Sequence, residues 1–100
     1  MTNKLTLIEA INLLNSIPNI SAVDTESDVA DVQDEAMRDY PIYYTLSVED
    51  GEAHFYGSGD CAWSRAHVVE FSAEASREDL LEAVKLGHLG KLDWSFSIGS

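Results

Sequence analysis

Residues 42–57, IYYTLSVEDGEAHFYG, decide the fold of this 100-residue chain. In the first half of the stretch, apolar and aromatic residues recur at every second position, which is typical of a β-strand with one buried face. The Asp50-Gly51 pair follows, and it favours a two-residue hairpin turn because both central turn residues need a positive φ. The chain then returns through AHFYG. The stretch therefore predicts an antiparallel β-hairpin.

Besides this hairpin, the sequence predicts one helix before it, and one helix and two strands after it. Thr6 and Glu9 stand at the spacing of a capping box, and the apolar stripe that follows predicts a helix ending before Pro18. A second helix is predicted to begin after Ser76 and to stop at Gly87. Further strands are predicted where apolar residues alternate again, at residues 67–71 and 92–98.

Residues 24–40 are predicted to form a helix or an ordered acidic loop, after a candidate short strand at residues 19–23. Val29, Val32 and Met37 fall at roughly helical spacing, and Ser27 is a plausible N-cap with Asp28 favourably placed beside it. Against a helix stand the many like charges three or four residues apart, which cost a few tenths of a kcal/mol per pair.

The predicted order is helix, acidic segment, three strands, helix and strand, in a single domain over residues 1–100. Strands linked by hairpins predict an antiparallel sheet. The expected fold is therefore of the α+β class, with about four strands and two or three helices packed on one face. The sequence does not determine whether the last strand lies at an edge of the sheet or between other strands.

The net charge excludes several classes of partner. The chain has 18 acids against 6 lysines and arginines, a net charge of −12. Such a field repels nucleic acid and anionic lipid and attracts basic proteins. No stretch has the length of a membrane span or the layout of a signal peptide, and the single cysteine cannot form an internal disulfide. We therefore expect a cytoplasmic protein that binds a basic protein, without contacting nucleic acid or membrane directly.

Residues that could carry chemistry are present, but not at the spacing of a recognisable site. Cys61 could be the nucleophile of a small enzyme, which is the alternative function of another class. Three histidines could act as its base: His54, His67 and His88. Asp60 and Cys61 with a histidine could bind zinc, but no C-x-x-C or H-x-x-x-H pattern supports this. The glycines of residues 57–59 lack the Gly-Lys-Ser/Thr of a P-loop. No catalytic residue, metal or cofactor is therefore predicted.

Acidic and aromatic residues outside the core are the candidates for a binding surface. Eleven acids and one base lie between residues 24 and 60. Self-repulsion in such a run destabilises the compact state, which favours a functional surface over a merely solvated one. Aromatic residues outside a core are frequent interface anchors. The predicted partner-binding residues are Asp28, Asp31, Asp34, Glu35, Asp39, Tyr43, Glu49, Asp50, Glu52, Tyr56 and Trp63.

The C-terminal half, residues 42–96, resembles the immunity proteins of bacterial polymorphic toxins. The resemblance rests on the hairpin IYYTLSVEDGEAHFYGSGD, the helix SREDLLEAVKLG and the tryptophan-bearing strand KLDWSF. Small acidic proteins of that family bind one cognate toxin, often a nuclease or a nucleotide deaminase, and block its active site. The resemblance thus implies an inhibitor that occludes a basic nucleic-acid-processing toxin.

Two other functions stay open on the sequence. Carboxylates three or four residues apart on a helix lie about 5–6 Å apart, which can imitate a row of phosphates. That spacing would suit an anti-CRISPR-like DNA mimic, by which a phage or mobile element inhibits a bacterial defence complex. The acidic surface could instead belong to a regulatory or assembly module. The oligomeric state is not determined by the sequence.

Overall fold

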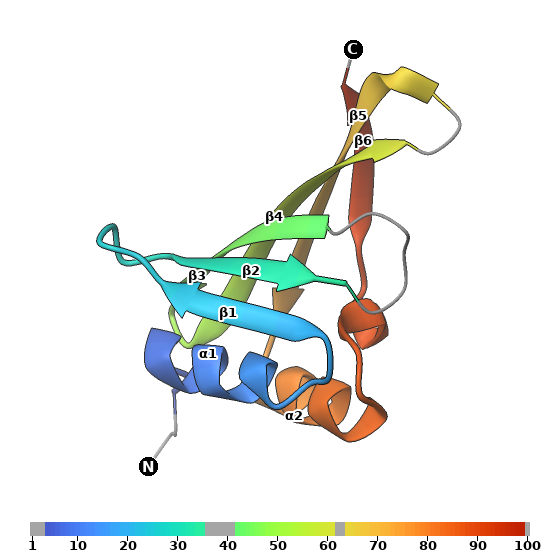
Figure 1. Ribbon diagram of the computed structural model, residues 1–100. Helices are drawn as coiled ribbons and strands as arrows, with labels where there is room; N and C mark the ends of the chain where they lie inside the picture. Colours follow the sequence, from blue (N-terminus) through green and yellow to red (C-terminus); the bar gives the residue numbers. More distant parts are fainter. Residues whose placement is uncertain (1–3, 36–41, 62–63, 100) are drawn as a thin grey trace.

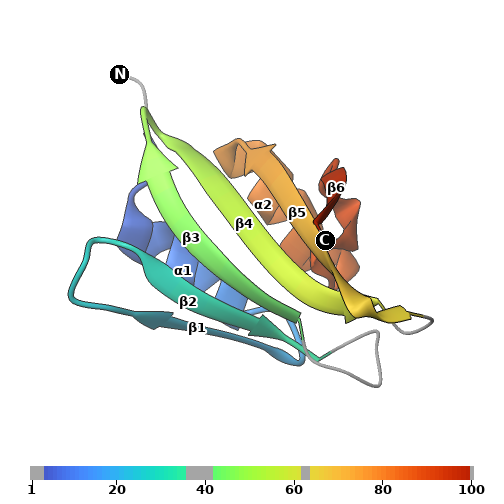
Figure 2. The same ribbon diagram turned by 90° about the horizontal axis from the view of Figure 1, so that it is seen from above.

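The described part of the chain forms a twisted sheet with helices on one face. The structure, a computed structural model, describes residues 4–35, 42–61 and 64–99, without the side chains of 42, 58–61, 64–69 and 96–99. Within these ranges, two α-helices cover one face of a six-stranded sheet (Figure 1). Seen from above, the helices lie behind the sheet, and the other face is not covered by a described element (Figure 2). The α+β class is confirmed, but the sheet is larger than the predicted four strands.

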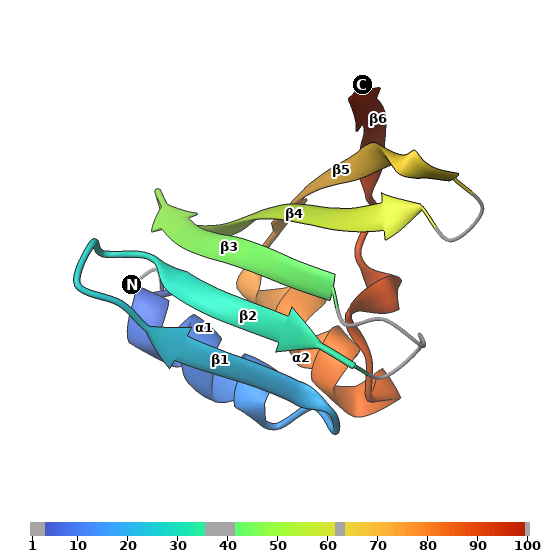
Figure 3. The same cartoon turned by 45° about the horizontal axis from the view of Figure 1, so that its top comes forward.

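The strands follow one another in the sheet in the order of the chain, each antiparallel to its neighbours (Figure 3). They are β1 (Ile20–Asp24), β2 (Ala30–Asp34), β3 (Ile42–Glu49), β4 (Glu52–Cys61), β5 (Ser64–Ala75) and β6 (Ser95–Gly99). The helices are α1 (Leu7–Asn15) and α2 (Arg77–Leu86), and a short 3-10 helix, η1 (Leu89–Lys91), precedes β6. The last strand therefore lies at an edge, next to β5.

Residues 20–34 form a β-hairpin. The candidate short strand at residues 19–23 is present as β1, whereas the helix or loop predicted for residues 24–40 is wrong over β2. Ala30 and Val32 are buried and the residue between them is exposed, which is a period of two. Asp28 has a φ of 60° in the turn, a left-handed conformation that aspartate tolerates. In a strand, successive carboxylates alternate between two faces, which separates charges that a helix would bring together. Residues 36–40 of the predicted segment lie outside the described residues.

The β3–β4 hairpin forms around Asp50-Gly51 as predicted. Asp50 and Gly51 have φ values of 52° and 82°, the positive values that the tight turn requires. The resulting register sets Tyr44 opposite Gly57. A Cβ atom at position 57 would lie 2.4 Å from Cδ1 of Tyr44, so glycine is needed for the tyrosine ring to lie across the neighbouring strand.

Trp94 joins the C-terminal segment to the covered face of the sheet. Its ring stacks on Tyr44 with 5.2 Å between the ring centroids, and it meets Phe55 and Phe71 edge-on at 6.1 and 6.4 Å. The strand predicted over residues 92–98 is shorter in the structure. It begins at Ser95, and Trp94 packs against the core from the segment before it.

Both helices begin where their caps were predicted, but in α1 the Glu9 carboxylate pairs with Arg77 instead of completing the predicted capping box. Oγ1 of Thr6 accepts a hydrogen bond from the backbone N–H of Glu9 (3.1 Å). The Glu9 carboxylate pairs with Nη1 of Arg77 (2.7 Å), at the start of α2, and this contact links the two helices. Helix α2 has the complete capping box, and Gly87 ends it with a φ of 76°.

The outer edge of β1 is covered by a side chain of α1. Asn15 donates from Nδ2 to the carbonyl of Ala22 (3.0 Å), and its Oδ1 accepts from the N–H of Ala22 (2.8 Å). The N–H of Ile20 donates to the carbonyl of Ile17 (3.2 Å). Unpaired backbone groups at a sheet edge are a template for pairing with another chain. At β1 these groups of Ile20 and Ala22 are already hydrogen-bonded within the protein.

We expect Asn15→Ala to lower the free energy of unfolding by about 1–3 kcal/mol, because it leaves the part-buried N–H and C=O of Ala22 without partners. Urea denaturation measures this. Asn12→Ala is the matched control, since Asn12 is exposed on the same helix, and it should change the stability by under about 0.5 kcal/mol. Equal losses in the two variants would contradict the edge-covering role of Asn15.

We expect Trp94→Ala to destabilise the fold by about 3 kcal/mol, the lower end for a large aromatic residue, since Trp94 is only partly buried. Thermal or urea unfolding measures this, and Asp93→Ala, at an exposed neighbouring position, is the control. A loss below about 1 kcal/mol would mean that the aromatic contacts of Trp94 do not hold the C-terminal segment to the sheet.

Candidate functional site

The alternation of the strands assigns two rows of backbone positions to the open face of the sheet, the face opposite the helices. We call them the Tyr43 row and the Tyr56 row. The Tyr43 row crosses β1 to β5 at Ser21, Gln33, Tyr43, Ser58 and Glu70. The Tyr56 row lies beside it, at Val23, Asp31, Thr45, Tyr56 and Ser72. Residues of the acidic segment and of the hairpin thereby come together on one surface.

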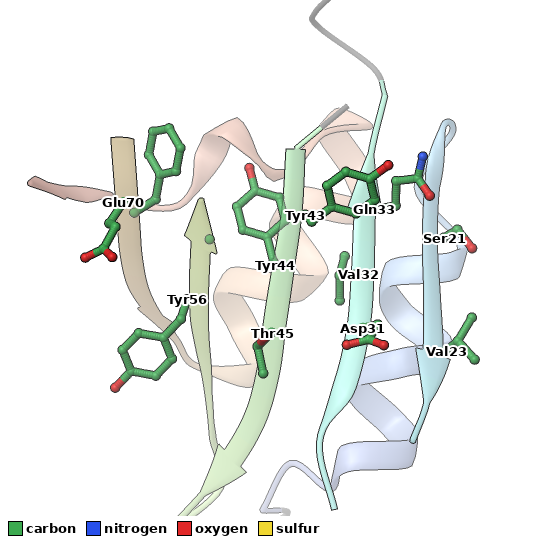
Figure 4. Close-up of a pocket in the computed structure, with 12 residues that line it drawn as sticks. Ser21, Val23, Asp31, Val32, Gln33, Tyr43, Tyr44, Thr45, Tyr56 and Glu70 are labelled. Carbon is green, nitrogen blue, oxygen red and sulfur yellow. The ribbon is translucent and has the colours of Figure 1, made fainter. Parts of the chain in front are cut away.

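A shallow hollow of about 700 Å³ lies over these rows (Figure 4). Besides the buried Tyr44, its lining includes two exposed tyrosines, Tyr43 and Tyr56, and two acids, Asp31 and Glu70. Thr45 lies between Asp31 and Tyr56 (Figure 4). The tyrosines are 57% and 62% exposed, although both belong to central strands. Large exposed aromatic side chains in a concave surface are favoured anchors of protein interfaces.

A second hollow, of about 340 Å³, lies on the same face beside the first. It extends from β4 across β5 to the segment before β6, and His54, Glu74 and Asp93 are among the residues that line it. Tyr56 lines both hollows and therefore stands at the boundary between them.

His54 lies between two carboxylates on this face. Its Nδ1 is 3.6 Å from Oε1 of Glu74, and its Nε2 is 4.0 Å from Oε2 of Glu49. The imidazole is largely covered, whereas both carboxylates are exposed. One imidazole carries at most one positive charge, so at least one negative charge of this group is uncompensated.

Charge is unevenly distributed between the two layers of the protein. Acids of the strands and of the segment before β6 gather on the open face: Asp31, Glu49, Glu52, Glu70, Glu74 and Asp93. The lysines and arginines with described side chains lie in the N-terminal segment or the helical layer: Lys4, Arg77, Lys85 and Lys91. Arg77 pairs with Glu9 and Lys91 with Glu82, at 2.7 and 3.2 Å. The negative field is therefore concentrated on the open face.

The predicted partner-binding residues are only partly brought together. Asp31, Tyr43 and Tyr56 line the larger hollow. Glu35 reaches the same face, where its Oε1 accepts a hydrogen bond from Nε2 of Gln33 (3.0 Å). The predicted residues at the β3–β4 turn lie at one end of this face: Glu49, Asp50 and Glu52.

Other predicted residues lie elsewhere. Asp34 shares the alternation of Ala30 and Val32, so it belongs to the covered side of β2 and is half-buried. Asp28 lies in the β1–β2 turn. The single helical row of carboxylates expected from the sequence is therefore a wrong prediction for the described part of this segment. Asp39 and Trp63 lie outside the described residues.

Glu70 and Glu74 were not among the predicted partner-binding residues. Glu74 lies beyond the strand predicted over residues 67–71, and Glu70 lies within it but outside the acidic run from which the candidates were chosen. In the structure β5 continues to Ala75. The buried residues Phe71, Ala73 and Ala75 alternate with the open-face residues Glu70, Ser72 and Glu74. This alternation is visible in the sequence and could have extended the strand.

Among the described residues, no group of three or more His, Cys, Asp or Glu side chains could hold a metal ion. The side chains of Asp60, Cys61 and His67 lie outside the described part, so the less favoured alternatives of a small enzyme or a zinc site at these residues stay open. No described helix has the length and apolar character needed to cross a bilayer.

We expect Tyr56→Ser to change the free energy of unfolding by under about 1 kcal/mol, because the side chain is exposed. A cross-strand pair such as the one it forms with Thr45 contributes only about 0.2–1 kcal/mol. Phe55→Ala, on the same strand but fully buried, should lose about 3–5 kcal/mol. Urea denaturation of both variants measures the difference. Similar losses would show that Tyr56 serves the fold and is not free to serve an interface.

Comparison with known proteins does not extend this picture. No family model, no curated protein and no solved structure matches the chain. The resemblance to immunity proteins therefore stays a prediction, and the open face is the basis on which function can be argued.

Proposed function

We propose that this protein is a stoichiometric inhibitor that uses the open face of its sheet to bind and occlude a basic nucleic-acid-processing protein. The observation that carries the proposal is the pair of exposed tyrosines, Tyr43 and Tyr56, set in one hollow among carboxylates with which no described lysine or arginine side chain pairs. By the resemblance, the first partner we propose is a toxin nuclease or deaminase, to which this chain would be the immunity protein. A nucleic-acid-binding defence complex would present a similar basic surface.

The charge of the open face supports the choice of partner. Proteins that process nucleic acids carry basic clefts, because the phosphate backbone dominates their affinity. A carboxylate-rich face complements such a cleft and accelerates the encounter of the two proteins. A polyanionic partner such as DNA itself would be repelled by the same carboxylates.

The tyrosines support a lasting complex. Charges at the rim of an interface act mainly on the rate of association, whereas desolvated aromatic anchors dominate the binding free energy. Tyr43 and Tyr56 occupy a concave part of the surface, where a partner can exclude water around them. Electrostatic attraction and aromatic anchors are thus combined on the same face.

Helical DNA mimicry has less support than occlusion by a sheet. The mimic required carboxylates three or four residues apart on a helix, but Asp31 and Asp34 lie on opposite sides of a strand. Inhibition through the open face needs no such row, because it depends on the net charge and on the anchors.

The test uses a triple variant of the open face, Asp31→Asn, Tyr56→Ser and Glu70→Gln. The wild-type protein, immobilised, captures its partner from a nuclease-treated lysate of the source cells, and the purified partner is then assayed. We expect the partner's nucleic-acid-processing activity to be lost at one equivalent of wild-type protein. The triple variant should associate at least about tenfold more slowly at low salt, with a flatter salt dependence, because fewer charges remain to be screened.

The matched control is Glu26→Gln, Glu78→Gln and Leu81→Ser, which removes the same charge and one exposed apolar side chain away from the open face. This control should associate almost as fast as the wild-type protein. The proposed function would be overturned if the partner kept its full activity at a molar excess of inhibitor. It would also be overturned if the wild-type protein and the open-face variant associated at equal rates at every salt concentration.

A further inference from the structure

The ring of Tyr56 is turned toward β5 (Figure 4). Tyr56 lies opposite Ser72 on that strand, and Glu70, two residues before Ser72, is its diagonal neighbour on the same face. Because Ser72 is small, the ring has room to lie toward β5, and the Glu70 carboxylate lies on the same side of β4 as the ring (Figure 4). Diagonal neighbours in an antiparallel pair are about 7–8 Å apart, within reach of aromatic and long side chains. The ring and the carboxylate therefore border the same part of the 700 Å³ hollow.

Glu70 has no cationic partner in the described part of the chain. None of the ion pairs between described side chains includes it, and no described lysine or arginine side chain lines the hollow. Glu74, the next acid along this face of β5, lies 3.6 Å from Nδ1 of His54. Of the two acids that flank Tyr56 along β5, Glu74 thus has a neighbour that can carry positive charge, whereas Glu70 needs a cation from another molecule.

A guanidinium group fits between the Tyr56 ring and the Glu70 carboxylate. It is planar, so one face stacks on an aromatic ring while its edge of N–H donors pairs with a carboxylate. These contacts need about 3.5–4 Å to the ring and about 2.7–2.9 Å to the carboxylate oxygen, for which a diagonal pair of side chains leaves room. A lysine ammonium group can reach Glu70, but it is strongly hydrated and has no plane to stack on the ring. Arginine is therefore the side chain that uses both groups.

The other exposed tyrosine is less suited to receive an incoming side chain. Tyr43 is turned toward β2 (Figure 4), where it lies opposite Gln33. Gln33 is larger than Ser72, and its Nε2 donates to Oε1 of Glu35 (3.0 Å). Tyr56 has the small Ser72 opposite it and lines both hollows, so that a bound chain can continue on either side of it.

The site is open, which indicates a side chain of a protein, and not a free small molecule, as the occupant. Sites for small molecules bury about 70–90% of the ligand surface. Here the ring is itself 62% exposed in a shallow hollow, so a guanidinium group stacked on it stays partly in water. Most of the binding free energy must then come from other contacts of the molecule that carries the arginine.

We propose that Tyr56 and Glu70 form the anchor site of the open face for one arginine side chain of the partner protein. The guanidinium group stacks on the Tyr56 ring and donates hydrogen bonds to the Glu70 carboxylate. This inference rests on the proposed function, because it names a contact by which a basic partner is held.

The test titrates the isotope-labelled full chain with two capped tripeptides, acetyl-GRG-amide and acetyl-GKG-amide, at about 0.15 M salt. We expect the arginine peptide to bind at least about twofold more tightly, with the largest amide shifts in β4 and β5 around Tyr56 and Glu70. Nuclear Overhauser contacts should join the δ-methylene protons of the arginine to the ring protons of Tyr56. Attraction by the general negative field of the protein would give no such contacts.

Three substitutions separate the role of the ring from that of the charge. Glu70→Gln should weaken the arginine peptide about two- to fourfold, as for an exposed ion pair of good geometry. Tyr56→Leu keeps an apolar side chain without the aromatic face, and it should bring the two peptides to equal affinity. Tyr56→Phe restores the ring and should restore the preference for arginine.

Two matched variants remove one charge each at other places. Asp31→Asn acts in the same hollow but on β2, the side away from which the Tyr56 ring is turned (Figure 4), and it should weaken the arginine peptide less than Glu70→Gln does. Glu78→Gln, an exposed acid on α2, should leave both affinities within about 1.5-fold. The dispersed amide spectrum of each variant verifies that it is folded.

Equal affinity of the wild-type protein for the two peptides would overturn the arginine-site inference, as would an unchanged preference for arginine in Tyr56→Leu. Equal losses in Glu70→Gln and Asp31→Asn would also overturn it, because the contact would then be a general attraction to the acidic face.

These results are independent of the partner experiment. If the tripeptides show no preference while the open-face variant still loses its partner, the proposed function stands and the arginine site is wrong. If the tripeptides behave as expected while the captured partner ignores the open-face variant, the arginine site stands and the proposed function is wrong.

Discussion

The contact on which the rest of the structure depends is the ring of Tyr44, lying across Gly57 and stacked on Trp94. It joins β3, β4 and the segment before β6, and it tolerates no Cβ atom at position 57. Because side chains alternate along a strand, the inward position of Tyr44 turns Tyr43 outward, and the inward position of Gly57 turns Tyr56 outward. The same register thus builds the aromatic core and exposes the two tyrosines. A shift of the strand register by one residue would turn the buried core side chains outward and the exposed tyrosines inward.

Much of the fold could be predicted where local preferences agree with long-range packing. Asp50-Gly51 sets the hairpin, and Gly87 ends α2, because few other residues adopt the backbone conformations these positions need. Residues 30–34, the strand described within the acidic segment, were predicted wrongly because helical spacing and strand alternation fit the apolar residues of the segment almost equally well. Pairing of Ala30 with Leu46 and of Val32 with Tyr44 decides for a strand, and no pattern within the segment contains that information.

The candidate binding face was harder to predict than the fold. Alternation alone assigns Tyr43 to the open face, but the acids that join it depend on the register between strands. Asp31 and Asp34 are equivalent in a count of charges, yet β2 turns them to opposite sides of the sheet. Glu70 comes from β5, outside the acidic run, and reaches the hollow because it pairs with Ser58. Charge density along the chain therefore predicted that the surface would be acidic, but it did not predict which residues form that surface.

The ion pairs and the covered edge at β1 support the proposal that the sheet binds a partner with its open face. At β1 the outward groups of Ala22 are bound by Asn15, which disfavours the addition of a further strand at that edge. Two cations of the helical layer, Arg77 and Lys91, pair there with Glu9 and Glu82, so they do not neutralise the acids of the open face, which repel one another. A cationic partner would remove this repulsion while binding only the folded protein. Its binding free energy would therefore add to the stability of the fold, and the repulsion that weakens the free protein would strengthen the complex.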